Sequence, residues 1–139
     1  PLPELHAGFF CRRDHPLTRL RQVTMRAMLR YPLASTPLSD EVARQLVEQY
    51  GEQANPAQMT KLCCEEVSSL IQTVLQTDAI YLGIRAAARA ELAQGALVEV
   101  PIQPALAARA RFALITLAGR TEGVGVTFLR GFVQEHLRD

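Results

Sequence analysis

Short apolar runs alternate along this chain with longer segments whose apolar residues recur at helical spacing, and this alternation limits the possible folds. Pro32–Ser35 and Ala79–Ile84 have the length and composition of buried strands. Ser39–Tyr50 and Val67–Thr77 carry apolar stripes of helical period. Strands that alternate with helices across short loops predict an α/β fold, in which helices cover both faces of a sheet.

The same patterns place the remaining elements. We expect further strands at Gly8–Arg13, Leu97–Val100 and Arg111–Ala118. Met59–Cys64 is mixed in composition, and we expect a strand there only because of its setting between helices. We expect further helices at Thr24–Arg30, Ala86–Gln94 and Val124–Leu137. In the last of these helices, the apolar residues expected to face inward are Leu129, Phe132, Val133 and Leu137.

Size and composition predict one folded domain without a strong electrostatic partner. The chain has 139 residues, of which 48% are hydrophobic and 21% charged, as in ordinary globular proteins. Its formal net charge of +1 gives no argument for nucleic acid or a membrane surface as a partner. No apolar run approaches the length of a membrane span, and no leader sequence marks export. Because the chain begins without a methionine, we expect it to be a fragment.

Cysteine usage favours a reducing compartment. The three cysteines are odd in number, and Cys63 and Cys64 are adjacent, so a disulfide framework is not expected. Adjacent residues on a strand point to opposite faces, which also argues against a shared metal ion. We therefore expect buried, inert thiols and a cytoplasmic protein.

The sequence gives no indication of catalysis. His6, His15 and His136 are far apart, and neither a Gly-x-Ser-x-Gly nor a His-Glu-x-x-His motif occurs. His15 precedes a proline, which is typical of a turn residue. We expect no enzymatic activity, no metal and no cofactor.

A ligand site is instead expected where a strand gives way to a helix. Ser35 and Thr36 follow the short strand, and the helix that begins near Ser39 comes next. In α/β folds, ligands collect at the carboxyl ends of strands, where free N–H groups and the helix dipole favour carboxylates and phosphates. Ser68 lies at a second such junction. Two helix starts that carry hydroxyl groups could converge on one small-molecule pocket.

These segments together resemble the effector-binding domain of a LysR-type transcriptional regulator. The resemblance is carried by the stretches CRRDHPL, RYPLASTPLSDEVARQLVE and EEVSSLIQTVLQTDAIYLGI, in that order. One departure is that the proline often found after the "Gly-Ile" strand is replaced by Arg85 or Ala86. A second is that the family's N-terminal winged helix-turn-helix, which binds DNA, is not in this sequence. The first part of the first subdomain, which supplies half of the cleft, is not in it either.

The resemblance implies a type 2 periplasmic-binding-protein-like fold, with two α/β subdomains joined by two crossing strands. Residues 1–139 would then be a partial effector-binding domain, mostly the second subdomain plus part of the first. Residues 14–102 would form the second subdomain, while 1–13 and 103–139 would hold the crossing strands and a remnant of the first. Gly8–Arg13 and Arg111–Ala118 would be the crossing strands.

The resemblance also implies a function and a set of site residues. The intact protein would bind a small anionic or polar effector in the cleft between the subdomains, form homo-oligomers, and reach DNA only through its winged helix-turn-helix. The candidate effector-binding residues are Ser35, Thr36, Cys11, Ser68 and Gly83.

Three other interpretations stay open. A solute-binding protein of a transport system on the same fold is the main alternative, and a secretion signal upstream would favour it. An enzyme on this fold has the least support, because no credible nucleophile and base are present. A stand-alone interaction module without a ligand is the third.

Overall fold

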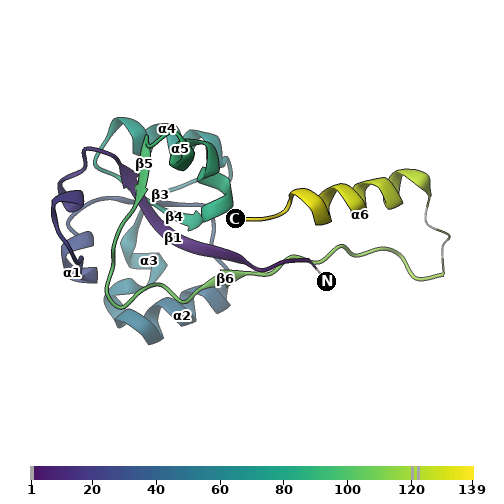
Figure 1. The fold of residues 1–139 in the computed structure, drawn as a ribbon. Helices are drawn as coiled ribbons and strands as arrows, with labels where there is room; N and C mark the ends of the chain where they lie inside the picture. Colours follow the sequence, from purple (N-terminus) through teal and green to yellow (C-terminus); the bar gives the residue numbers. More distant parts are fainter. Residues whose placement is uncertain (1, 120, 122) are drawn as a thin grey trace.

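The first strand, β1 (Leu5–Arg12), runs through the middle of the sheet in the computed structural model, which describes residues 2–119, 121 and 123–139. The sheet has the strand order β3-β2-β4-β1-β5, and β6 pairs with the amino-terminal end of β1 (Figure 1). The other strands are β2 (Leu33–Ser35), β3 (Thr60–Cys63), β4 (Ile80–Ile84), β5 (Leu97–Glu99) and β6 (Arg109–Ala110).

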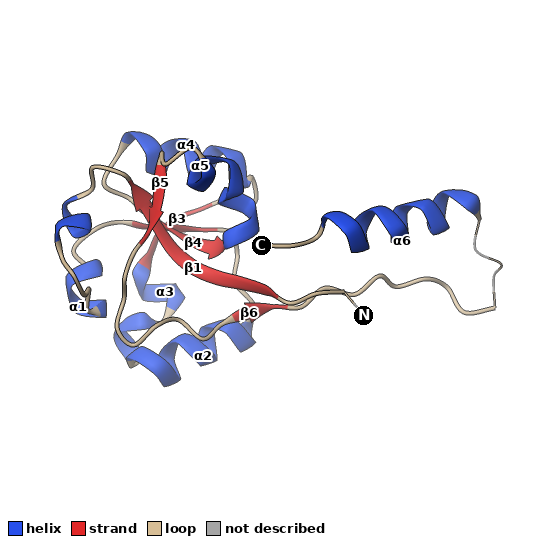
Figure 2. Ribbon diagram, viewed as in Figure 1, coloured by secondary structure: helices blue, strands red, loops and turns tan. Residues whose placement is uncertain are grey.

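Helices and single turns connect the strands (Figure 2). The α-helices are α1 (Met25–Met28), α2 (Asp40–Tyr50), α3 (Pro56–Met59), α4 (Val67–Gln76), α5 (Arg89–Ala93) and α6 (Val124–His136). The 3-10 turns are η1 (Pro16–Arg19), η2 (Glu52–Ala54) and η3 (Arg85–Ala88).

Strand direction brings several carboxyl ends to one edge of the sheet. β2 pairs in parallel with β3 and β4, whereas β1 is antiparallel to β4 and to β5. We call the line of residues Ser35–Thr36, Cys63–Cys64 and Gly83–Ile84 the carboxyl edge. The amino-terminal half of β1 leaves the body at this edge, because Ala7 pairs with Ile84 and Leu5 pairs with Ala110 of β6.

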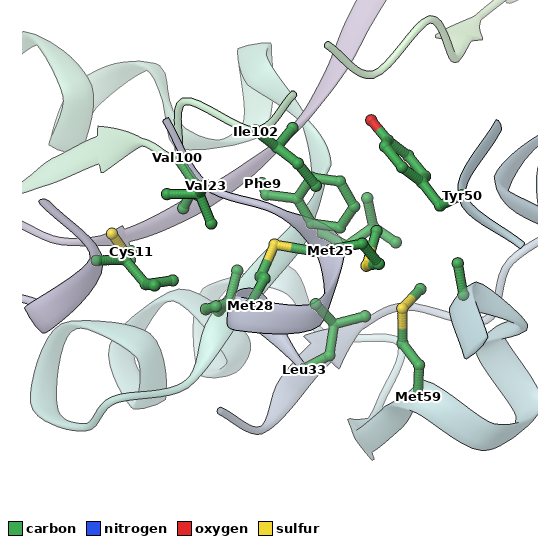
Figure 3. Close-up of a cluster of buried hydrophobic side chains, with 14 of the residues drawn as sticks. Phe9, Cys11, Val23, Met25, Met28, Leu33, Tyr50, Met59, Val100 and Ile102 are labelled. Carbon is green, nitrogen blue, oxygen red and sulfur yellow. The ribbon is translucent and has the colours of Figure 1, made fainter. Parts of the chain in front are cut away.

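Two hydrophobic cores lie on the two faces of the sheet. Phe9 packs into one core with residues of α1, α2 and α3 (Figure 3). Phe10, its neighbour along β1, points the other way into a core formed with α4 and α5. Both rings are almost fully buried, and each contributes about 2–3 kcal/mol through removal of apolar surface from water. β1 therefore holds the two layers of helices on one sheet.

Local sequence signals account for the ends of α2. Ser39 is the N-cap, and its Oγ accepts a hydrogen bond from the backbone N–H of Val42 at 3.3 Å. Gly51 ends the helix with φ of 89°, a conformation that side chains other than glycine rarely adopt. The predicted α/β class, with helices on both faces, is confirmed, as are the expected strands that became β2, β3, β4 and β5.

Two expectations for the C-terminal part are wrong. Residues 111–117 form no strand, and β6 covers only Arg109–Ala110, because no neighbouring strand in the described chain is available to pair with the rest. Val124–His136 is a helix, but none of its residues is buried, and Phe132 is 50% exposed. The helix lies apart from the main body (Figure 1), so its apolar side chains do not face a core.

None of the helices in the described part of the chain combines the length and the apolar run that a membrane crossing requires.

Two buried tyrosines offer a matched test of the packing. Tyr50 Oη donates a hydrogen bond to the carbonyl oxygen of Pro104 at 2.7 Å, whereas the Tyr81 hydroxyl has no partner within the described residues. We expect Tyr50→Phe to lower the free energy of unfolding by about 1 kcal/mol, because a part-buried carbonyl loses its donor. Tyr81→Phe should change it by less than about 0.5 kcal/mol. Urea unfolding of both variants checks this, and equal losses would contradict the assigned hydrogen bonds.

Candidate functional site

The Ser35 side chain is the central feature of the carboxyl edge. It is the last residue of β2 and is 1% exposed, and its hydroxyl has no hydrogen-bond partner among residues that the structure describes. Its backbone oxygen is engaged, since it accepts from Cys64 N at 3.3 Å. A buried hydroxyl without a partner is costly. Ser35 Oγ retains a trace of exposed surface, in contrast to Thr60 Oγ1, which is fully enclosed and unpaired.

Thr36 lies next to Ser35, and two grooves near the start of α2 and the C-terminal segment are lined by neither residue. Thr36 is half-buried, and its hydroxyl likewise has no partner in the described chain. A groove of about 690 Å³ lies between the arm at residues 111–114 and α6, and another of about 610 Å³ runs from the start of α2 to Arg109 and Arg111. The second groove therefore joins the amino-terminal end of α2 to the chain segment that pairs with β1.

Gly83 lies at the same edge beneath an aromatic ring. A Cβ at Gly83 would lie 2.1 Å from Tyr81 Oη, so only glycine fits there unless the ring moves. Tyr81 is 2% exposed, and burial raises the pKa of its hydroxyl, which keeps it protonated as a donor. Sequence reasoning missed Tyr81. The signal for it is the spacing of two between Tyr81 and Gly83, which places both on one face of β4.

Ser68 also lies at the carboxyl edge, but on the other face of the sheet from α2. It is exposed in the first turn of α4, and its hydroxyl donates to Glu66 Oε1 at 2.9 Å. α4 follows β3, whose last residue pairs with Ser35. The structure therefore brings Ser35, Thr36, Ser68 and Gly83 to one edge.

Cys11 is not brought to this edge. Strand β4 lies between β1, which carries Cys11, and β2, which carries Ser35. Phe9 and Ser35 both pair with Leu82 of β4, and Cys11 lies two residues beyond Phe9 along β1. Its side chain is 1% exposed, and burial raises the pKa of the thiol to about 11. At neutral pH the Cys11 thiol is therefore fully protonated.

His15 has a structural role, in agreement with its prediction as a turn residue. Its Nδ1 accepts from Leu17 N at 3.1 Å and so caps η1. Because Nδ1 is an acceptor, Nε2 carries the proton and donates to the carbonyl oxygen of Asp78 at 2.8 Å. Both ring nitrogens are used, and the residue is fully buried.

The expectation of buried thiols at Cys63 and Cys64 is wrong. Cys63 is exposed and Cys64 is half-exposed, and both are free thiols. The physical reason is that β3 is an edge strand, whose residues 61–63 are all exposed.

Charged contacts join the two chain segments that leave the body together. Glu4 Oε2 accepts a hydrogen bond from Arg109 Nη1 at 3.3 Å, and Glu4 Oε1 forms an ion pair with Arg111 Nε at 2.6 Å. The hydrogen bond from Arg109, together with the charge of Arg111, lowers the pKa of the Glu4 carboxyl. His6 N donates to the side chain of Asp139 at 3.1 Å, so the last residue also reaches β1.

The family of the chain follows from its sequence. Residues 1–138 match the model of the LysR substrate binding domain. The chain belongs to this family. No curated protein sequence matches it.

Solved structures of LysR-type regulators and similar proteins share the fold. A putative transcriptional regulator from Vibrio parahaemolyticus has a TM-score of 0.69 at 19% identity, over 97% of this chain and 61% of that one. The Synechocystis CcmR regulatory domain in complex with 2-PG has a TM-score of 0.67 at 15% identity, over 100% of this chain and 67% of that one. The effector-binding domain of QuiR in complex with shikimate has a TM-score of 0.65 at 12% identity, over 97% and 62% of the two chains. The fold is thus the type 2 periplasmic-binding-like fold, and this chain spans roughly three fifths of those domains.

The three thiols should differ sharply in reactivity. We expect Cys63 to react with a disulfide reagent at once under native conditions, Cys64 more slowly, and Cys11 only after unfolding, because it is buried and protonated. Thiol titration at neutral pH, followed by mass spectrometry of the peptides, measures this order. Rapid native labelling of Cys11 would contradict the position assigned to it.

Proposed function

We propose that this domain senses a small polar or anionic molecule at the carboxyl edge and so controls DNA binding by the intact regulator. The observation that carries the proposal is the buried, unpaired hydroxyl of Ser35 at the end of β2. Thr36 adds a second free hydroxyl beside it. Two unpaired hydroxyl groups at one edge suit an oxygen-rich ligand.

The related domains support the sensing role. The CcmR domain is described with 2-PG and the QuiR domain with shikimate, so members of this fold bind small molecules as effectors. The family match also favours a regulator over the solute-binding protein of a transport system. Family and fold neighbours are regulators, and we assign the chain to sensing rather than catalysis.

The route from effector to DNA would run through β1 and β6, which we call the crossing segments. β1 and β6 leave the body at the carboxyl edge, beside the candidate site, and Glu4 links them through Arg109 and Arg111. An effector can shift the equilibrium between two conformations only by as much as its affinity for one exceeds its affinity for the other. We propose that the effector favours one of two conformations related by a hinge motion about β1 and β6.

The proposal also covers the subdomain, the contact with DNA, oligomerisation and the location of the protein. Residues 14–102 would act as the second subdomain, although β1 lies in the same sheet as the strands of that segment. DNA would be reached through a winged helix-turn-helix outside this sequence. Homo-oligomerisation would fit the exposed apolar side chains of α6, such as Phe128 at 73% exposure. The free thiols support a cytoplasmic location.

Removal of single hydroxyl groups tests the site. A thermal-shift screen of small carboxylates and phosphates first selects an effector that stabilises the chain. We expect Ser35→Ala and Thr36→Val each to weaken its affinity by about threefold to tenfold, as the loss of one hydrogen bond predicts. Isothermal titration calorimetry measures the change.

Thr73→Val provides the matched control, because the Thr73 hydroxyl bonds to Ser69 O within α4, away from the edge. This variant should bind the effector with unchanged affinity. Unchanged affinity in Ser35→Ala and Thr36→Val as well would reject the assignment of the site. Failure of every compound to stabilise the chain would reject effector binding by this chain.

A further inference from the structure

A separate cavity of about 260 Å³ lies between the carboxyl-terminal part of β1, η1 and β5. We call it the Cys11 pocket; among the residues that line it are Cys11, Arg13, Leu17, Thr18, Val98 and Val100. Cys11 pairs with Val98 across the sheet, so strands β1 and β5 form one wall. Ser35 belongs to β2, two strands away from β1, so this pocket is distinct from the carboxyl edge.

The floor of the Cys11 pocket is apolar and buried. Cys11, Leu17 and Val100 are all at most 3% exposed and belong to the core on the α1 face. Cys11 is protonated at neutral pH because burial raises its pKa to about 11, and a protonated thiol behaves as a small hydrophobic group. These surroundings suit the apolar body of a ligand, since burial of apolar surface stabilises its binding.

A positive charge without a partner stands at the rim. The Arg13 side chain is exposed and forms no ion pair or hydrogen bond within the described residues. Its neighbour Arg12, by contrast, is paired with Asp78 at 2.7 Å. Glu99 also lines the pocket, but its carboxylate is held in an ion pair with Arg85. The free charge at the pocket is therefore positive.

Polar capacity is also available beside Arg13. Thr18 Oγ1 donates its proton to the carbonyl oxygen of His15 at 2.6 Å, which leaves the oxygen able only to accept. A neutral ligand group could donate a hydrogen bond to Thr18 Oγ1. A carboxylate could instead pair with the Arg13 guanidinium. Because Arg13 supplies a planar array of donors that matches a carboxylate, the anion is favoured.

We propose that the Cys11 pocket binds a small monocarboxylate with a compact apolar body. The carboxylate would pair with Arg13, and the apolar body would lie against Leu17, Val98 and Val100. The cavity has room for roughly nine water-sized groups, which limits the ligand to a small molecule such as benzoate or a short fatty acid. This proposal does not rest on the sensing role of the carboxyl edge.

Amide NMR of the 139-residue chain tests the proposal with acetate, butyrate, hexanoate and benzoate as probes. We expect butyrate, hexanoate or benzoate to shift the amide signals of Thr18, Val98 and Glu99, with acetate weaker because it has almost no apolar body. Benzamide, which matches the shape of benzoate without its charge, should bind at least about tenfold more weakly. If no probe shifts these signals, or if benzamide binds as well as benzoate, the proposal is wrong.

Two variants and a control separate the pocket from general charge effects. Arg13→Ala should weaken binding by about tenfold, whereas Arg21→Ala, which removes an equally exposed arginine elsewhere, should not change it. Val98→Phe should fill the pocket and abolish the shifts, and dispersed NMR spectra would show that it is folded. Because Arg13 is exposed, Arg13→Ala should fold normally. This variant therefore still tests the proposal if Val98→Phe does not fold.

The positions of the shifted signals distinguish this pocket from the effector site. Equal affinity in Arg13→Ala and the unmodified chain would overturn the proposal. Shifts confined to residues 35–36 and 83 would also overturn it, while supporting the carboxyl edge as a carboxylate site. Shifts at Thr18 and Val98 alone would support the Cys11 pocket. They would not bear on the carboxyl edge, which the calorimetric titration of the effector tests separately.

Discussion

The antiparallel pairing of β1 with β4 is the interaction on which the rest of the structure depends. It joins residues 7–10 to residues 81–84, and thereby ties the start of the chain to the middle of the sheet. It places Gly8 opposite Gly83, with the rings of Phe10 and Tyr81 lying over these two glycines. It also sends alternate side chains of β1 into the two cores, so this strand packs against the helices on both faces of the sheet.

The same pairing gives the fold its functional arrangement. β1 runs against the direction of β2 and β4, so its amino-terminal half leaves the body where those strands end. A ligand at Ser35 and Thr36, as proposed, would therefore bind beside β1 and β6. Near its carboxyl-terminal end, β1 instead meets η1 and β5 and forms the wall of the Cys11 pocket. A single strand thus links the two places where we propose that a small molecule binds.

Local patterns predicted the elements that depend on local causes. Helix α2 follows from the cap at Ser39 and the stop at Gly51, and β4 follows from a continuous apolar run. Properties that depend on distant partners were not predictable in this way. The spacing of apolar residues in α6 predicts a helix, but it does not predict which surface the apolar side of that helix contacts. The exposure of Cys63 depends on β3 being an edge strand. Ser35, Thr36 and Gly83 could be placed at one edge from strand direction, but the separation of Cys11 from them requires the antiparallel register of β1.

Hydrogen–deuterium exchange with and without the effector from the thermal-shift screen tests the central claim most directly. If the ligand binds at the carboxyl edge and acts on the crossing segments, exchange should slow at residues 35–42 and 83–85, and also at residues 5–8 and 108–110. η1 should be unchanged, because it follows the opposite end of β1 from this edge. Slower exchange limited to other parts of the chain, with none at residues 35–42, would contradict the claim that the free hydroxyl of Ser35 marks the effector site.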